Sequence, residues 1–141
     1  MRTPLSSLLA RMRPHSDDEQ AAERAYRDQV LSVTGRVQAL FEAWADMRQI
    51  EPDYALLANG AAVQRWELMR LAQDVEGSTP PRGLGAVHRE LLERVVDAAR
   101  ACQLLANGYR SHKSEAICDG QALFLETVAC LDRLAKQIGR D

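Results

Sequence analysis

Three histidines and three cysteines are the first side chains of this chain to consider for metal binding or proton transfer. The histidines are His15, His88 and His112. None belongs to an H-x-x-x-H, H-E-x-x-H or E-x-x-H pattern, the spacings that bring two ligands to one face of a helix. His112 and Glu115 are one turn apart in the opposite order, which is typical of a contact at a helix start. We therefore expect neither a metal nor a cofactor.

The cysteines are Cys102, Cys118 and Cys130. An odd number at these spacings fits neither a disulfide framework nor a C-x-x-C pair, and this indicates a reducing compartment. Cys102 falls in a row of apolar positions, so we expect it to be a buried and inert core residue. Cys118 is the candidate for a reactive thiol, because it lies near a helix start with His112 and Lys113 upstream.

His88 also lies in an apolar row, so its ring should face other helices and need a hydrogen-bond partner, as in a satisfied core histidine. Arg82 precedes it by six residues. This R-x5-H pair resembles the R-x4-6-H motif of HEPN-type helical ribonucleases, in which the Arg and His lie together at a helix start and assist RNA cleavage. The resemblance covers these two residues and implies an RNA-cleaving role for them. Gly83 stands where that family often has a polar residue.

Three large rings, Trp44, Trp66 and Phe124, fall at or near positions that should face the interior of the fold. They can fill a core, or they can line a cavity for an apolar ligand between helices. The second alternative names Trp44, Trp66, His88 and Phe124 as ligand-binding residues. The sequence has no Gly-rich phosphate loop, no G-x-S-x-G elbow and no nucleophile with an identifiable base, so we predict no catalytic residues and do not favour an enzyme.

The composition fits one soluble globular domain, with 141 residues, of which 46% are hydrophobic and 27% charged. A formal net charge of -2 disfavours nucleic acid as a partner. Lys113 and Lys136 are the only lysines, and this bias toward arginine is typical of a bacterial genome of high GC content. No apolar run reaches the ~18 residues of a membrane span and the start lacks a secretory core, so we expect a cytoplasmic protein that does not contact membranes.

Residues 1–14 stand apart as a short amphipathic arm that begins near Thr3-Pro4 and ends at Pro14. Its apolar residues lie on one side: Leu5, Leu8, Leu9 and Met12. The arm also carries Arg2, Arg11 and Arg13 and no acidic residue. It can pack on the bundle or on a partner, form a disordered tail, or act as an organellar targeting peptide.

The first long helix should start at the S-x-x-E capping box of Ser16 to Glu19 and end at Glu51-Pro52. Its apolar residues recur at steps of three and four. They are Tyr26, Val30, Val33, Val37, Leu40, Trp44 and Met47.

Asp53 can cap a second helix, in which we expect a break or kink near Gly60 and a stop at Gly77. Its apolar residues wind around more of the circumference than in the first helix. They are Leu56, Leu57, Val63, Trp66, Met69, Ala72 and Val75.

A third helix should run from about Leu84 through Cys102 to a stop at Asn107-Gly108. The fourth, capped by Ser111 or Ser114, should carry an apolar stripe and fray at Gly139. Its members are Ile117, Phe124, Val128, Leu131, Ala135 and Ile138.

Four amphipathic segments joined by short linkers can bury their stripes only against each other. The sequence therefore predicts an all-α, antiparallel up-down-up-down four-helix bundle over residues 15–141, preceded by the arm at 1–14. The first helix should overhang its partners, and a second copy of the chain is the expected cover. For function we expect a non-enzymatic protein–protein interaction or scaffold module, which forms a homodimer or binds another protein through the arm and first helix. The alternatives are a small-molecule sensor and, third, a HEPN-like ribonuclease.

Overall fold

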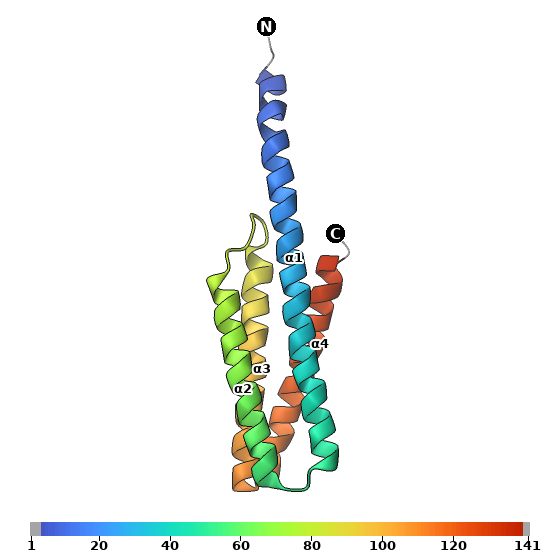
Figure 1. Cartoon of the computed structure of the whole chain (residues 1–141), viewed down its shortest axis with the longest axis vertical. Coiled ribbons are helices and arrows are strands. Elements are labelled where there is room, and N and C mark those ends of the chain that lie inside the picture. Colours follow the sequence, from blue (N-terminus) through green and yellow to red (C-terminus); the bar gives the residue numbers. More distant parts are fainter. Residues whose placement is uncertain (1–3, 140–141) are drawn as a thin grey trace.

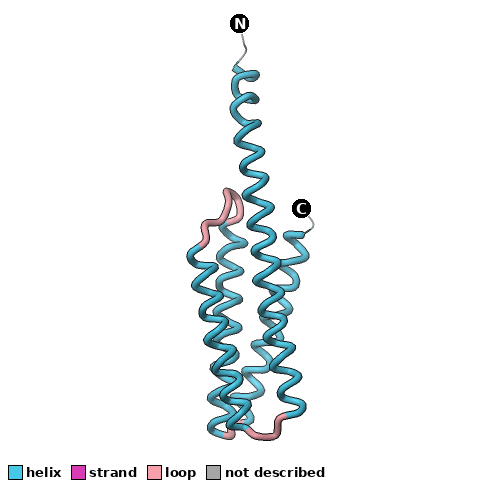
Figure 2. Tube along the Cα trace, in the orientation of Figure 1, coloured by secondary structure: helices cyan, strands magenta, loops and turns pink. Residues whose placement is uncertain are grey.

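The structure of the chain, a computed structural model, describes the backbone of residues 4–139 and the side chains of residues 17–139. Within these limits it contains helices and no strand. The helices are α1 (Pro4–Ile50), α2 (Tyr54–Gly77), α3 (Gly85–Ser111) and α4 (Ser114–Gly139). Successive helices run in opposite directions and are joined by short turns (Figures 1 and 2). The predicted all-α four-helix bundle is confirmed.

α1 is longer than the sequence pattern indicates and projects beyond the other helices (Figure 1). The expected interruption at Pro14 is wrong for the backbone, and Ser16 lies inside the helix instead of at its start. A proline removes one helical hydrogen bond and can be accommodated by a bend instead of a stop. The side chains of the predicted arm lie outside the described residues. The side chains of residues 17–25 are all exposed or partly exposed, and Tyr26 is the first of the described side chains that is buried.

The heptad row predicted for α1 is its inner face. Val30 and Val37 are fully buried and Trp44 is 2% exposed. The α1–α2 turn is closed by Asp53, whose carboxylate accepts a hydrogen bond from the backbone N–H of Ala55 at 2.9 Å. The predicted N-cap of α2 is therefore confirmed.

Two glycines that the sequence pattern marks as helix breakers lie inside helices. α2 continues through Gly60, and α3 continues through Asn107 and Gly108 to Ser111. A Cβ on Gly108 would lie 2.8 Å from Cγ1 of Ile117, so this glycine serves the close approach of α3 and α4 instead of ending a helix.

The end of α3 is formed by His112, whose φ of 51° and ψ of 43° place it in the left-handed region. The backbone N–H of Lys113 donates to the carbonyl oxygen of Gly108 at 2.9 Å. This bond pattern is a Schellman-type cap, built here without glycine at the left-handed position.

α3 packs closely along both α2 and α4, whereas α1 has fewer close backbone approaches to any of them. The residues that face each other explain the difference. The inner faces of α2, α3 and α4 contain many small residues, among them Ala58, Ala61, Ala98, Ala101, Cys102, Ala106, Gly108 and Gly120. The inner face of α1 carries rings and branched side chains, which hold the backbones farther apart.

The rings of α1 form the centre of its contact with α4. Phe124 is fully buried, and its ring centroid lies 5.1 Å from that of Phe41 in an edge-to-face arrangement and 6.2 Å from that of Trp44. None of the described helices is long and apolar enough to cross a lipid bilayer.

Candidate functional site

The four residues predicted to line a ligand pocket do not come together. Trp44 and Phe124 are neighbours in the core between α1 and α4. His88 lies in the first turn of α3, toward the α2–α3 turn. Trp66 lies on the outer face of α2 and is 60% exposed. The expectation that Trp66 faces the interior is wrong, because α2 carries two apolar stripes and Trp66 belongs to the outer one.

His88 has the partner that a partly buried histidine needs. The hydroxyl of Tyr26 is 2.6 Å from its Nδ1. Burial raises the pKa of Tyr26, so the hydroxyl stays protonated at neutral pH. The tautomer of the imidazole decides which of the two groups donates the hydrogen bond. Arg82 is exposed in the turn before α3. The Tyr26–His88 bond thus joins α1 to α3, and His88 is partly buried, outside the set of buried core residues.

The cysteines occupy three different environments. Cys102 is buried, and burial raises the pKa of its thiol to about 12, so it is inert as expected. Cys130 is partly buried and accepts a hydrogen bond from Nη2 of Arg133 at 3.1 Å. Cys118 is exposed near the start of α4. It is the described thiol that a reagent or ligand can reach most directly.

Cys118 lies in a groove of about 370 Å³ between α1 and α4. One wall is formed by Phe41 and Trp44 of α1, and the other includes Leu125 of α4, which is 58% exposed. The polar residues of the groove are Arg48, Cys118 and Gln121, and the remaining lining consists of Ala45 and Ala122. The groove has the composition of a small-molecule site, with apolar walls and few polar groups.

Arg48 is held at the edge of this groove by Trp44. Its guanidinium carbon lies 5.3 Å from the centroid of the indole ring, within the range of a cation–π contact. In the part of the chain that the structure describes, Arg48 forms no ion pair with a carboxylate. Its charge is therefore available to a ligand in the groove.

The indole N–H of Trp44 and the hydroxyl of Tyr109 are both buried and lie near each other. Neither the indole N–H nor the Tyr109 hydroxyl makes a hydrogen bond of standard geometry within the described residues. Burial raises the pKa of Tyr109, and the nearby Trp44 indole and Arg48 charge partly offset the rise. Tyr54 covers this end of the bundle, with its ring 5.3 Å from that of Tyr109 and stacked 5.0 Å from that of His112.

A second surface feature is an apolar stripe on α2, formed by Leu56, Val63 and Trp66. These side chains are 52%, 57% and 60% exposed, and they follow each other at steps of seven and three. They lie on the side of α2 opposite to its buried residues, which include Leu57, Ala61, Leu68 and Val75. The guanidinium of Arg70 lies over the Trp66 ring, 5.0 Å from its centroid. We call this the outer stripe.

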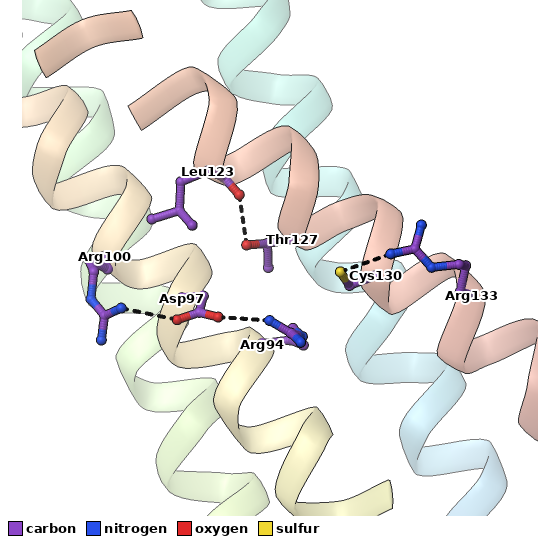
Figure 3. A network of polar contacts seen from close by, with 7 residues as sticks. All are labelled: Arg94, Asp97, Arg100, Leu123, Thr127, Cys130 and Arg133. Carbon is purple, nitrogen blue, oxygen red and sulfur yellow. Dashed lines mark hydrogen bonds and ion pairs between the residues drawn. The ribbon is translucent and has the colours of Figure 1, made fainter. Parts of the chain in front are cut away.

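The polar network on α3 and α4 is confined to pairs within one helix (Figure 3). Asp97 lies between Arg94 and Arg100, at 3.2 and 3.3 Å. The buried hydroxyl of Thr127 donates to the carbonyl oxygen of Leu123 at 2.7 Å. Each of these contacts pairs polar groups of one helix, and none brings polar groups of different helices together.

The sequence pattern missed most of the groove and part of the outer stripe. Arg48 and Gln121 are more than 70 positions apart in the sequence, and no local pattern indicates that they line the same groove. The winding of apolar residues around α2, by contrast, is a signal for the outer stripe. No group of three His, Cys, Asp or Glu side chains close enough to hold a metal occurs in the described residues. Comparisons of the chain with models of protein families, with curated proteins and with solved structures found no match.

Proposed function

We propose that this protein is a non-enzymatic interaction module that forms a homodimer through the outer stripe of α2. The observation that carries the proposal is the exposure of Leu56, Val63 and Trp66 in one row, on a helix whose opposite face already fills the core. Contiguous exposed apolar surface on a soluble domain is typical of an association site. Tryptophan is also among the residue types that contribute most to binding energy at interfaces.

The projecting part of α1 supports the role of an interaction module, separately from the outer stripe. From residue 17 to 25 the helix carries charged side chains, one amide and alanines, and no large apolar side chain. This segment is therefore a solvated spacer, which holds the predicted arm at a distance from its own bundle (Figure 1). A surface presented in this way is suited to contact another molecule, as the sequence predicts for the arm and first helix.

The test is the oligomeric state of the purified chain, measured by light scattering after size exclusion and by native mass spectrometry. We expect a dimer for the wild type and a monomer for Val63→Glu, because the dimer would bury the outer stripe and an unpaired charge at its middle would then be strongly unfavourable. Leu125→Glu is the matched control, since Leu125 is equally exposed but lies on α4. A wild type that stays monomeric at high micromolar concentration, or a Val63→Glu variant that stays dimeric, would overturn the proposal.

A further inference from the structure

We propose that the groove between α1 and α4 binds a small amphiphilic carboxylate. Its apolar body would lie against Phe41, Trp44 and Leu125, and its carboxylate would pair with Arg48. The site shares no residue with the outer stripe, so it stands or falls independently of the proposed dimer.

The apolar part of this inference rests on the walls of the groove. Leu125 is more than half exposed although it faces the rings of α1 across the groove. Covering Leu125 together with the exposed part of Phe41 removes apolar surface from water, which favours an apolar ligand. Trp44 is 2% exposed and adds little to this area. A volume of about 370 Å³ is at the lower end of the range for small-molecule sites. It suits a medium-length acyl chain better than a large cofactor.

The charged part rests on Arg48. Among the described residues that line the groove, Arg48 alone carries a full charge at neutral pH. The cation–π contact with Trp44 fixes the guanidinium at the groove edge, so less conformational freedom is lost when a ligand binds. Arginine pairs with carboxylates through two parallel hydrogen bonds. The amide of Gln121 supplies a further polar group in the same groove.

The same charge argues against the predicted arm of a second copy as the occupant. The arm carries Arg2, Arg11 and Arg13 and has no acidic residue before Asp17. Placing it in the groove would bring like charges together beside Arg48, which is unfavourable where water is partly excluded. An anionic ligand is the occupant that the groove complements.

The test uses octanoate as the probe and the emission of Trp44 as the signal. Trp66→Phe leaves Trp44 as the one tryptophan, because the chain has two. We expect a saturable change of emission with octanoate, and an affinity about tenfold lower in Arg48→Gln. Arg70→Gln in the same Trp66→Phe background is the control, since it removes an arginine charge beside the ring at position 66, outside the groove. Octan-1-ol should bind more weakly than octanoate and should be insensitive to Arg48→Gln.

A second measurement uses the wild type and does not depend on these variants. Octanoate should slow the reaction of Cys118 with a thiol reagent, whereas Cys130, which lies outside the groove, is the internal reference. The proposal is overturned if octanoate gives no saturable change, if Arg48→Gln binds it as well as the wild type does, or if Cys118 is not protected. It is also overturned if Trp44 emission depends on protein concentration without ligand, since the occupant would then be a second copy.

Discussion

The two sides of this bundle are built on different principles. α2, α3 and α4 approach each other closely through alanine, glycine and Cys102, so their contacts depend on backbone-to-backbone fit. α1 is held by large rings and by hydrogen bonds that cross to its neighbours. The amide of Gln64 on α2, for example, donates to the carbonyl oxygen of Leu40 at 2.9 Å. Close packing tolerates no added atom, whereas contacts made by long side chains can adjust.

The largest effect should come from removing the ring that joins α4 to α1. We expect Phe124→Ala to lower the free energy of unfolding by about 3–5 kcal/mol, because it leaves a cavity beside Phe41 and Trp44. Urea unfolding followed by circular dichroism measures the change. Leu125→Ala, at the adjacent exposed position, should stay within about 0.5 kcal/mol of the wild type. Similar losses in the two variants would contradict the placement of the rings.

The small-residue side is tested at Gly120. An added Cβ would lie 2.8 Å from Cγ of Leu105 and 3.0 Å from the carbonyl oxygen of Ala101, and the backbone oxygen cannot move without moving α3. Gly120→Ala should therefore destabilise the fold by about 1–3 kcal/mol in thermal or urea unfolding. Gly35→Ala is the control, because nothing lies within 4 Å of its added Cβ. It should stabilise α1 by about 0.5–1 kcal/mol through helix propensity.

Alkaline pH should lower the free energy of unfolding because of Cys102, which lies among the small residues between α2, α3 and α4. Burial raises the pKa of its thiol from 9.0 to about 12. Between these values the unfolded chain has lost the thiol proton and the folded chain retains it, so stability falls as the pH rises. One such proton corresponds to a slope of about 1.4 kcal/mol per pH unit. Cys102→Ala should reduce the measured slope of unfolding free energy above pH 9, and an unchanged slope would show that Cys102 is not the source.

The smallest effect is expected where α2 meets α1. A Cβ on Gly60 would lie 2.5 Å from Cε and 2.8 Å from Sδ of Met47, which form the end of a flexible side chain. Met47 can turn away, and alanine gains helix propensity over glycine. Gly60→Ala should therefore change the unfolding free energy by less than about 1 kcal/mol. If it cost as much as Gly120→Ala, the contrast between the two sides would be lost.

The apolar rows of α1 and α4 were sufficient to predict the bundle, because their steps of three and four hold over several turns. The arrangement around α2 was harder to predict. Val63 and Trp66 are as apolar as core residues, and composition does not show which of two stripes faces inward. The left-handed residue at His112 was also missed, since Asn107-Gly108 offered a stronger stop signal than a histidine.

The groove could not be predicted from the sequence, for a different reason. Arg48 and Cys118 belong to helices that are separated by the whole of α2 and α3. Their proximity follows from the packing of α1 on α4 and not from any local pattern, so a sequence of one chain cannot place them together. The contact between α1 and α4, the first and last helices, is visible only in the three-dimensional structure.

The contact between α1 and α4 also determines when the rings of α1 can be buried during synthesis at the ribosome. The inner face of α1 is synthesised first. Phe124, which packs against Phe41 and Trp44, follows Trp44 by 80 positions. At typical elongation rates this interval lasts roughly 4–16 s. During this time α2 and α3 can shield the nascent first helix only in part, and its aromatic residues are open to chaperones or to a neighbouring nascent chain. Assembly of the domain is therefore completed by its last helix.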